Sequence, residues 1–415
     1  MEFLEELQAR GLLKQVTNSE KIKQAKNSNA SVYCGIDPTA TSLHVGHLVQ
    51  IVLLYRFSLA GFKPLAVIGG ATAMIGDPSF KVEERKLLDA KTVKLNSDAL
   101  ALQLDKLLDH NIKVLNNDDW ISKLNLIDYL RDSGKEFTIN YMLDKESIKT
   151  RLATGISYTE FSYMLLQAYD FWYLYKNYQC LIQIGGSDQW GNITAGIELI
   201  RKKEQDNHLA SGLTIELLTQ SNGVKFGKTE QGTIWLDANL TSQYILYQFF
   251  VNQNDADVEK LLKWLTLLSL DDILQIMAKH NVNKAKRYAQ KVLAKEIVAF
   301  AHSQQEVMVA INISEALFSQ KVMQLQMSEI QQMKNAVPWI TVSQEHKLID
   351  LLLLLEVCSS KTQVRELLKS NAIYVNEQII NDENYLLSKD KLLYDKIIFI
   401  RKGKQHYYIV EVNSH

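Results

Sequence analysis

Short runs of apolar residues alternate with turn-forming residues near the start of the 415-residue chain. Ser31 to Ile36 and Pro64 to Gly69 are typical of strands, and Leu48 to Tyr55 between them is typical of a helix. The pattern returns at Gln179 to Gly185 and at Leu213 to Leu218. Strands that alternate with helices favour an open parallel sheet with crossover helices, so we expect an α/β protein. Ligands of such a sheet bind beyond the carboxyl ends of its strands.

The rest of the chain has a different pattern. Leu240 to Gln332 consists of long amphipathic runs without a strand-like segment, which predicts a helical domain. Pro338, one of only four prolines, marks a hinge. After it, Ser360 to Lys369 is helix-like, whereas 372–375 and 396–400 are strand-like. We expect a Rossmann-like domain with a parallel sheet at 1–220, a connection at 221–239, an α-helical domain at 240–332, a linker at 333–343 and a small α+β domain at 344–415.

Composition excludes several classes of protein. Hydrophobic residues make up 47% of the chain and charged residues 22%, which is ordinary usage for a water-soluble globular protein. Lys and Arg total 46 against 47 Asp and Glu, so the chain lacks overall basicity and any RNA contact must come from local patches. Three cysteines are too few for a disulfide framework, and the acidic start lacks the features of a secretory signal. We therefore expect a cytoplasmic protein.

The sequence DPTATSLHVGH links the first strand-like run to the helix-like run. We expect Thr41 or Ser42 to cap that helix. His44 and His47 then lie in or near its first turn, where unpaired backbone N–H groups attract anions, and the two imidazoles share one face. Gly46 leaves room for a bulky group beside the backbone. A zinc half-site or two surface histidines would give the same pair, but no third ligand follows nearby in the sequence.

A second candidate is the sequence KFGKT at Lys225 to Thr229. Two lysines and a hydroxyl around a glycine suit a polyphosphate, although most lysine-rich loops are simply solvated. The segment lacks the upstream glycine of a P-loop, which excludes that interpretation. Lys81 and Arg85, after a Gly-Asp-Pro turn, are further candidate phosphate ligands with the same alternative.

The aromatic segment FSYMLLQAYDFWYLYKN carries a polar stripe. Tyr163, Gln167 and Asp170 stand at positions i, i+4 and i+7, on one face of the predicted helix. A buried carboxylate needs partners, so the stripe either closes a structural hydrogen-bond network or lines a polar pocket. The sequence GGSDQW follows a strand-like run, so Asp188 and Gln189 reach the same crevice. Carboxylates at this place bind ribose hydroxyls in nucleotide-binding sheets.

Taken in order, these segments resemble the class I aminoacyl-tRNA synthetases, specifically the bacterial type of tyrosyl-tRNA synthetase. His44 to His47 matches the HIGH signature of the family, with valine for isoleucine, and Lys225 to Thr229 matches its KMSKS signature. The segments YCGIDPT at 33–39, YMLLQAYD at 163–170 and GGSDQW at 185–190 also match. The resemblance runs over essentially the whole chain.

The resemblance implies that the carboxylate of tyrosine attacks the α-phosphorus of ATP, pyrophosphate leaves, and the tyrosyl group passes to its tRNA. Mg2+ would accompany ATP, with no metal ligands supplied by the protein. Implied catalytic residues are Thr39, His44, His47, Lys81, Arg85, Lys225, Lys228 and Thr229. ATP would also contact Cys34, Gly35, Asp37, Gly46, Gln50, Gly186 and Asp188, besides His47 and Lys228. Tyrosine would be bound by Tyr33 and Asp170 at the phenol, Asp77, Tyr163 and Gln167 at the ammonium group, and Gln183 and Gln189 at the carboxylate.

The last unit is similar to the S-four-type RNA-binding domain that ends bacterial members of this family. From Gln344 onward ten Lys and Arg residues are balanced by ten Asp and Glu residues, so only local clusters suggest RNA. Candidate contacts are Lys361, Arg365, Lys369, Arg401, Lys402 and Lys404, with Lys284, Lys286, Arg287, Lys291 and Lys295 in the helical domain facing the anticodon arm. A solvated surface would look the same. The family also implies a homodimer with its interface at about 111–160.

Three positions depart from the family pattern. Phe80 and Ala73 stand where glycine is common, and Gln50 occupies a variable position that tunes ATP affinity. If the glycine at position 80 has a positive φ, the loop must differ here, which affects the reach of Lys81 and Arg85.

Three other functions remain as alternatives. Tryptophanyl-tRNA synthetase shares the sheet, but Tyr33 and the stripe at 163, 167 and 170 argue against it. A small HxGH nucleotidyltransferase is generally a single domain. A non-catalytic RNA-binding protein derived from a synthetase would be expected to have lost signature residues, which are intact here.

Overall fold

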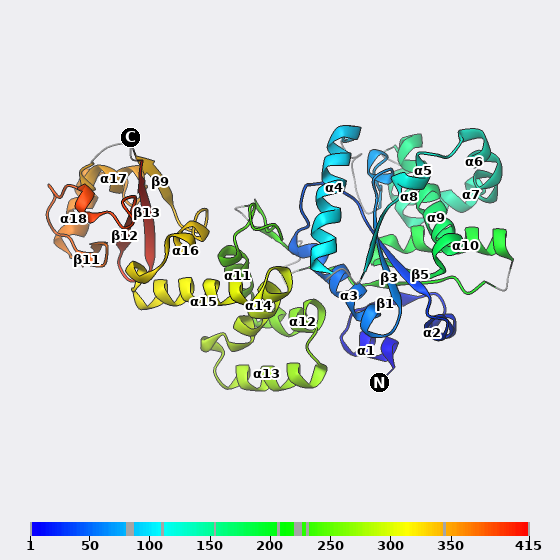
Figure 1. Cartoon of the computed structure of the whole chain (residues 1–415), viewed down its shortest axis with the longest axis horizontal. Coiled ribbons are helices and arrows are strands. Elements are labelled where there is room, and N and C mark those ends of the chain that lie inside the picture. The colour runs from blue at the N-terminus through cyan, green and yellow to red at the C-terminus, as the bar shows by residue number, and fades with distance from the viewer. Residues whose placement is uncertain are drawn as a thin grey trace. The chain divides into compact units, whose positions relative to one another are not determined.

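The computed structural model (Figure 1) describes residues 2–79, 87–108, 112–152, 155–205, 208–219, 226–229, 232–342 and 346–413. The chain forms two compact units, Met1–Asp237 with Gln253–Leu293, and Ala238–Asn252 with Ala294–His415. This division separates α11 (Gln243–Val251) from α12 (Asp255–Leu265) and α13 (Leu270–Val282), all of which lie in the predicted helical domain. The domain boundaries proposed from the sequence therefore stay predictions.

The first unit is built on a six-stranded sheet with the order β1-β6-β5-β2-β3-β4. All neighbouring pairs are parallel except β1 with β6, which is antiparallel at one edge. The strands are β1 (Leu13–Val16), β2 (Ser31–Ile36), β3 (Lys63–Ile68), β4 (Lys113–Asn116), β5 (Cys180–Gly186) and β6 (Ser211–Ile215). The parallel α/β core is confirmed, although the last strand ends at Ile215 rather than at the predicted Leu218. The strand order reverses between β2 and β5, which is where such sheets bind ligands.

Helices connect these strands. The bounds are α1 (Phe3–Ala9), α2 (Ser19–Asn27), α3 (Leu48–Leu59), α4 (Ala90–Leu107), α5 (Asp118–Ile121), α6 (Leu126–Asp132), α7 (Ile139–Leu143), α8 (Glu146–Leu152), α9 (Tyr158–Tyr178) and α10 (Trp190–Glu204). The aromatic helix α9 begins where the Ser157 hydroxyl accepts the N–H of Glu160, and it ends at Gln179 in the left-handed conformation. Tyr33 of β2 and Phe171 of α9 are buried together in the core between sheet and helix. This packing fixes α9 over the carboxyl ends of β2 and β5.

The turn before α3 differs from the prediction. His44 itself caps the short 3-10 turn Val45–His47, because its Nδ1 accepts the N–H of Gly46 at 3.0 Å. The Nδ1 of His47 in turn accepts the N–H of His44 at 3.1 Å. The Ser42 hydroxyl instead donates to the Leu43 carbonyl and accepts the N–H of Asp237. The predicted cap at Thr41 or Ser42 is wrong because imidazole nitrogens satisfy the N–H groups that a hydroxyl would cap.

The second unit contains a five-stranded sheet with the order β11-β10-β12-β13-β9. Its elements, with the helices around them, are α11, α15 (Gln304–Ser319), α16 (Met327–Gln332), β9 (Trp339–Val342), α17 (Leu348–Leu354), α18 (Lys361–Lys369), β10 (Ile373–Val375), β11 (Gln378–Ile379), β12 (Ile397–Lys402) and β13 (His406–Val412). Four residues of the linker predicted at 333–343 thus form β9, because the short Trp-Ile-Thr-Val run pairs with β13. The expected small α+β domain is present.

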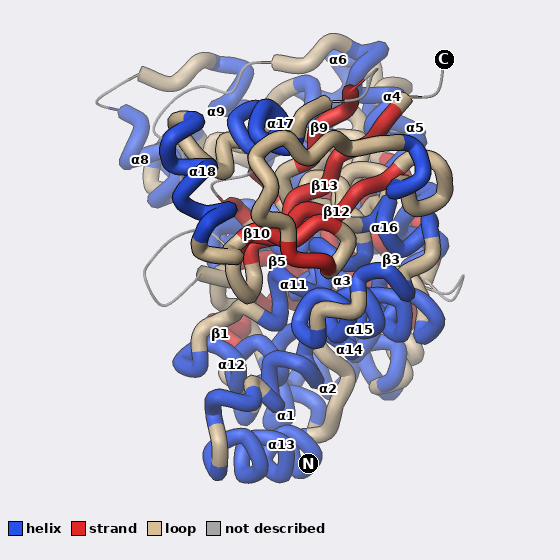
Figure 2. The backbone as a smooth tube through the Cα atoms, turned by 90° about the vertical axis from the view of Figure 1, so that its left-hand side faces the viewer, coloured by secondary structure: helices blue, strands red, loops and turns tan. Residues whose placement is uncertain are grey.

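The two faces of this second sheet carry separate cores. Ile398, Ile400 and Val410 pack with α17 and α18, whereas Phe399 and Ile409 pack with residues of α11, α15 and α16. This alternation follows from the two-residue period of a strand. Figure 2 shows β12 and β13 side by side, and Figure 1 shows α17 and α18 on the side of these strands opposite to α16.

The remaining elements are β7 (Lys228–Thr229), β8 (Gly232–Thr233) and α14 (Tyr288–Ala301). Over the residues that the structure describes, we find no helix with the length and apolar character that crossing a membrane requires.

Candidate active site

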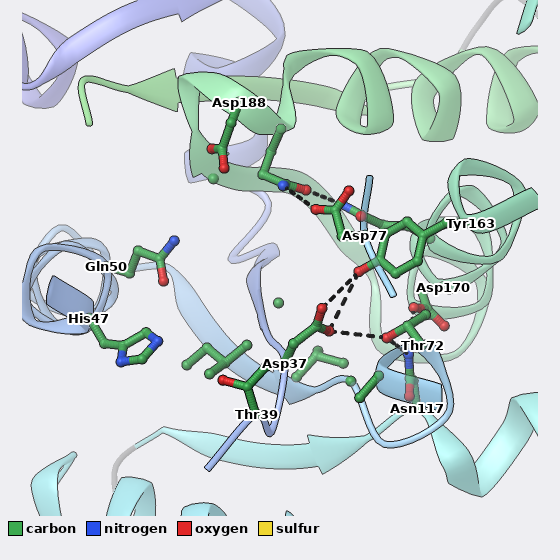
Figure 3. Close-up of a pocket in the computed structure, with 18 of the residues that line it drawn as sticks. Asp37, Thr39, His47, Gln50, Thr72, Asp77, Asn117, Tyr163, Asp170 and Asp188 are labelled. Atoms are coloured by element: carbon green, nitrogen blue, oxygen red, sulfur yellow. Dashed lines mark hydrogen bonds between the residues drawn. The ribbon is translucent and has the colours of Figure 1, made fainter. Parts of the chain in front are cut away.

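A pocket of about 610 Å3 opens at the carboxyl ends of β2 and β5, bounded by α9 and the start of α3 (Figure 3). It brings together most residues that the sequence singled out. These are Tyr33, Gly35, Asp37, Thr39, His44, His47, Gln50, Asp77, Tyr163, Gln167, Asp170, Asp188, Gln189 and Lys228. Ala73, one of the departures from the family pattern, also lines the wall. A sheet whose strand order reverses here explains why residues so far apart in sequence converge.

Some predicted residues lie elsewhere. Cys34, Gly46, Gln183, Gly186 and Thr229 are not among the residues that line the pocket. Gln183 is 1% exposed, and its side-chain oxygen has no hydrogen-bond partner within the described part of the chain. Burial raises the pKa of the Cys34 thiol to about 12, which makes it an inert packing group. Lys81, Arg85, Lys225 and Phe80 fall outside the described residues.

Asp170 marks the deep end of the pocket. Its Oδ1 accepts the indole N–H of Trp120 at 2.7 Å, and its Oδ2 accepts the Asn117 amide at 2.9 Å. Burial raises the pKa of Asp170 to about 7, against the opposing effect of these two hydrogen bonds. The buried hydroxyl of Tyr33, which lines the same pocket, has no hydrogen-bond partner among the described residues. A ligand hydroxyl that donates to Asp170 and accepts from Tyr33 would satisfy both groups.

The sequence analysis missed Asn117 and Trp120. Asn117 directly follows β4, and the same Asn side chain also donates to Thr72 Oγ1 at 3.1 Å and accepts the N–H of Ala71 at 2.8 Å. The signal that would have found it is a polar residue after another parallel strand of the same sheet. Trp120, on α5, stacks on the ring of Tyr173 with centroids 4.6 Å apart, so its indole N–H is held in place. No sequence pattern indicated this contact.

Asp77 belongs to a chain of amide groups in the middle of the pocket. The Gln189 amide donates to Asp77 Oδ2 at 2.7 Å, and the Gln167 amide donates to Gln189 Oε1 at 3.2 Å. Asn192 donates to the side-chain oxygens of both glutamines, at 3.0 and 3.1 Å. The N–H of Ser79 adds a bond to Asp77 Oδ1 at 2.9 Å. These bonds fix a carboxylate and amide oxygens where a ligand ammonium group would find acceptors.

Asp37 occupies the neighbouring wall. The Tyr163 hydroxyl donates to Asp37 Oδ2 at 3.2 Å, and Thr72 Oγ1 donates to Asp37 Oδ1 at 3.3 Å (Figure 3). Burial, followed by the nearby Asp37 charge, raises the pKa of Tyr163 well above its usual range. A Cβ at Gly69 would lie 2.2 Å from Asp37 Oδ1, so only glycine leaves room for this carboxylate. The polar stripe on α9 therefore both lines the pocket and closes a hydrogen-bond network.

The two histidines lie at the start of α3. Their rings stack with centroids 3.9 Å apart, which confirms that they share one face. Burial lowers the pKa of both, that of His47 to about 3, so both rings are neutral at pH 7. Because each Nδ1 accepts a backbone N–H, the proton of each neutral ring is on Nε2, which can donate a hydrogen bond to a ligand. The ring of His44 fills the space beside Gly46, where we had expected a ligand group.

Lys228 reaches the pocket from the β7–β8 hairpin, whose strands pair antiparallel. Gly227 before it has φ +87°, and a Cβ there would lie 2.6 Å from Val45 Cγ2. Val45 N–H donates to the Ile234 carbonyl at 3.0 Å, and Ile234 N–H donates to the Gly227 carbonyl at 3.0 Å. Two motifs distant in sequence are thereby packed against each other. Glycine at 227 is required both for the backbone angle and for this close approach.

The charges on the pocket wall are mostly negative. Four carboxylates line it, namely those of Asp37, Asp77, Asp170 and Asp188, whereas Lys228 is the single lysine or arginine that the described residues contribute. Burial, followed by the Asp77 charge, raises the pKa of Asp188. An anionic wall suits a ligand with a cationic group, and neutral imidazole donors together with Lys228 suit an anion at the opposite end.

The predicted RNA-binding residues of the second unit are partly engaged within it. Arg401 is 5% exposed, lies 3.7 Å from the ring centroid of Tyr374 and donates to the Gly403 carbonyl. Lys402 donates to the Val357 carbonyl at 3.0 Å. Lys361 pairs with Asp350 at 3.0 Å and Arg365 with Glu383 at 2.6 Å, both at exposed sites, and Lys369 and Lys404 are exposed. Their role in RNA binding stays a prediction.

Comparison with known proteins identifies the family. A family model for class I tRNA synthetases of tryptophan and tyrosine matches residues 25–319, and a model of the tyrosine–tRNA ligase SYY-like C-terminal domain matches residues 329–410. The tyrosine–tRNA ligase of Mycoplasma capricolum subsp. capricolum is 51% identical over 410 residues, which cover 99% of each chain.

Solved structures agree with these matches. A C-terminally truncated Aspergillus nidulans mitochondrial tyrosyl-tRNA synthetase superposes with a TM-score of 0.68 at 34% identity, covering 76% of this chain and 94% of that one. A tryptophanyl-tRNA synthetase from Encephalitozoon cuniculi reaches a TM-score of 0.53 at 13% identity over 73% of this chain and 86% of that one, which shows a shared fold alone. The chain thus belongs to the tyrosine–tRNA ligase family of class I tRNA synthetases.

Proposed function

We propose that this protein activates L-tyrosine with ATP to form tyrosyl-adenylate and pyrophosphate, and then transfers the tyrosyl group to the 3′ end of tRNA(Tyr). The observation that carries the choice of amino acid is the deep end of the pocket. There the buried Tyr33 hydroxyl, which has no described partner, lines the same pocket as the Asp170 carboxylate, which is held by Trp120 and Asn117. The substrate phenol would donate to Asp170 and accept from Tyr33. Phenylalanine would leave both groups unpaired in a buried site, which is unfavourable.

The other end of tyrosine would meet the hydrogen-bonded chain of Asp77, Gln189 and Gln167. Its ammonium group has Asp77, Gln167 and Tyr163 within the same wall, with Asp77 already fixed by Gln189 and Ser79. Gln189 would also orient the substrate carboxylate. Gln183 is buried away from the lining, so we assign it a supporting role behind that wall. The carboxylate then points toward the end of the pocket where His44, His47 and Lys228 gather.

ATP would occupy the end of the pocket formed by His44, His47 and Lys228. Asp188 would bind ribose hydroxyls, and Gly186 leaves room for it because a Cβ there would lie 2.5 Å from Asp188 Oδ1. Gly35, Asp37, Cys34 and Gln50 would surround the nucleoside, and Gly46 would keep His44 in place beside it. Thr39, the Nε2–H groups of His44 and His47, and Lys228 would donate to the phosphates. Lys81, Arg85, Lys225 and Thr229 complete the proposed set on sequence grounds.

The chemistry needs positioning more than proton transfer. An oxygen of the tyrosine carboxylate forms a bond to the α-phosphorus, and the bond from that phosphorus to the bridging oxygen breaks as pyrophosphate leaves with the electron pair. Negative charge grows on the leaving phosphates, so donors fixed at that place lower the barrier. Neutral histidines can serve in this role because each Nδ1 is held by a backbone N–H, which leaves Nε2–H as a fixed donor.

Mg2+ would enter with ATP. Within the described part of the chain no group of three or more His, Cys, Asp or Glu side chains is arranged to hold a metal ion. A Mg2+ ion that enters with a nucleotide is held chiefly by phosphate oxygens and water, with at most one or two carboxylates from the protein. Its chemistry there would be neutralisation of phosphate charge.

We further propose a homodimer that binds tRNA(Tyr) in the cytoplasm. Around the segment predicted as the interface, 111–160, large apolar side chains are exposed, namely Leu126, Ile127, Leu130, Ile139, Leu152 and Tyr158. Exposed apolar clusters of this kind favour association with another chain. All three cysteines are free, which suits a reducing compartment. The predicted basic residues of the helical region and the last domain would contact the RNA.

The test is amino-acid-dependent exchange of labelled pyrophosphate into ATP. We expect exchange with tyrosine and Mg2+, and none above background with tryptophan or phenylalanine. Exchange with tryptophan would contradict the assignment of the deep end. Folded protein that exchanges with none of the three would remove the proposed catalytic function and leave a non-catalytic RNA-binding protein.

A further inference from the structure

A polar cluster joins α12, α13 and α14 next to the loop between α13 and α14, two helices that Figure 1 labels. His280 and Gln290 are both 0% exposed. Each approaches the same oxygen, because His280 Nε2 lies 3.2 Å from Asp255 Oδ1 and Gln290 Nε2 donates to that atom at 2.6 Å. Asp255, at the start of α12, is partly exposed, and its pKa is lowered chiefly by the hydrogen bond from Gln290. Three helices therefore meet at one carboxylate oxygen.

The loop above this cluster is exposed and basic. Residues 281–286, which run from the end of α13 into the loop, are all exposed, including Lys284 and Lys286. At the end of the loop Arg287 has φ +51°, a left-handed conformation that is unfavourable for a residue with a Cβ. The Arg287 guanidinium donates to the Gln253 carbonyl at 2.6 Å, and Gln290 also reaches this carbonyl at 3.3 Å. The same cluster thus anchors the loop through both Asp255 and the backbone of Gln253.

The arrangement leaves two buried polar atoms without a partner in the part of the chain that the structure describes. His280 Nδ1 and Gln290 Oε1 are buried and have no hydrogen-bond partner among the described residues. Burying unpaired polar atoms is unfavourable, and a well-packed apolar pair in their place would stabilise the helices more. Backbone strain together with incompletely satisfied polar groups is typical of positions that serve function rather than stability. What the cluster does provide is one fixed geometry for the loop.

We propose that His280 and Gln290 are positioning residues for tRNA, which hold the loop 283–287 so that Lys284 and Lys286 meet the phosphate backbone. The inference rests on the proposed function and specifies how the helical region grips its RNA substrate. Two lysines on a fixed loop bind a phosphate pair better than two on a mobile loop, because less side-chain and backbone entropy is lost on binding. His280 itself, being fully buried, does not touch the RNA.

The test compares matched variants of the full chain. His280→Leu removes the donor to Asp255, whereas His280→Gln keeps an amide N–H at nearly the position of Nε2. We expect His280→Leu to weaken tRNA binding about tenfold, the order of effect when one or two phosphate contacts are weakened, and His280→Gln to restore most of it. The slope of log Kd against log salt should fall by about one to two as the lysine contacts are lost. Ile276→Val, which removes a methylene from the buried face of the same helix, is the control and should leave both quantities unchanged.

A double-mutant cycle separates positioning from simple destabilisation. Lys284→Ala with Lys286→Ala removes the proposed contacts directly. If His280 acts through this loop, adding His280→Leu to the lysine variant should weaken binding by less than about twofold more. Multiplicative effects would overturn the proposal, as would an unchanged tRNA affinity in His280→Leu. Gln290→Leu provides the same cycle if His280→Leu does not fold.

Tyrosine-dependent pyrophosphate exchange distinguishes a failure of the positioning role from a failure of the proposed function. Exchange needs no tRNA, so His280→Leu, Gln290→Leu and the control Ile276→Val should retain the wild-type rate. Loss of exchange in the wild-type protein would contradict the proposed function. Normal exchange with normal tRNA binding in His280→Leu would contradict the positioning role alone.

Discussion

The two ends of the pocket are built in different ways. Asp170 at the deep end and Asp77 in the middle of the pocket are buried carboxylates with their hydrogen-bond donors already in place. At the outer end, His44, His47 and Lys228 present donors, and each imidazole uses its Nδ1 to accept a backbone N–H. The deep end is organised before a ligand arrives, which favours selection of one amino acid. The outer end offers donors for charge that develops during the reaction.

Substitutions should therefore affect different kinetic constants at the two ends. We expect Lys228→Ala to slow adenylate formation by about 100- to 1,000-fold, the range for removal of one donor to developing charge. Tyrosine affinity should stay near normal because Lys228 lies at the other end. Pre-steady-state measurement of adenylate formation, with tyrosine binding measured separately, checks this. Lys106→Ala on α4 is a control for loss of a surface lysine. Equal loss of binding and rate would show that the two ends do not act separately.

The deep end should give the opposite result. Asp170→Asn keeps the shape of the side chain but replaces an acceptor with an amide, so the substrate phenol loses its charged partner and Trp120 and Asn117 lose theirs. We expect KM for tyrosine in pyrophosphate exchange to rise about 100-fold, with a smaller change in kcat. Asp98→Asn, an exposed aspartate on α4, should behave as wild type. A fall in kcat without a change in KM would contradict the placement of the phenol.

Trp120→Phe tests whether the donors behind Asp170 matter. The ring that stacks on Tyr173 is retained, whereas the indole N–H that donates to Asp170 is lost. We expect about a tenfold rise in KM for tyrosine, which corresponds to one hydrogen bond to a charged group. Tyr173→Phe keeps the stacked ring and the Asp170 bonds and serves as the control. If Trp120→Phe and Tyr173→Phe have the same KM for tyrosine, the indole N–H has no part in tyrosine selection.

The difference between the ends also shows what the sequence can and cannot predict. The parallel sheet was predicted because strand and helix periodicities are local. The spacing of Tyr163, Gln167 and Asp170 placed them on one helix face, and the resemblance to the family made that face a pocket wall. Trp120 was missed because its contact with Asp170 joins two elements across about 50 positions of sequence. The cap was predicted wrongly because local propensity favours a hydroxyl, whereas the fold supplied the imidazole of His44. Long-range contacts such as that of Trp120 with Asp170, and caps supplied by unusual side chains such as His44, cannot be predicted from the local pattern of a single sequence.

The smallest effect concerns pH. Burial raises the pKa of Asp170 to about 7 in the free protein, so the carboxylate is ionised above this pH and protonated below it. A substrate phenol donates to the ionised form, and therefore tyrosine affinity should weaken as pH falls through about 7, by less than about tenfold per unit. The same raised pKa works in the other direction for folding, since the buried charge makes the protein less stable as pH rises from about 4 to 7. Tyrosine Kd measured from about pH 5.5 to 8 should show this dependence in the wild type and lose it in Asp170→Asn. A profile that is flat in both would mean that Trp120 and Asn117 keep Asp170 ionised over the whole measured pH range. The deep end would then bind tyrosine equally well at every pH in that range.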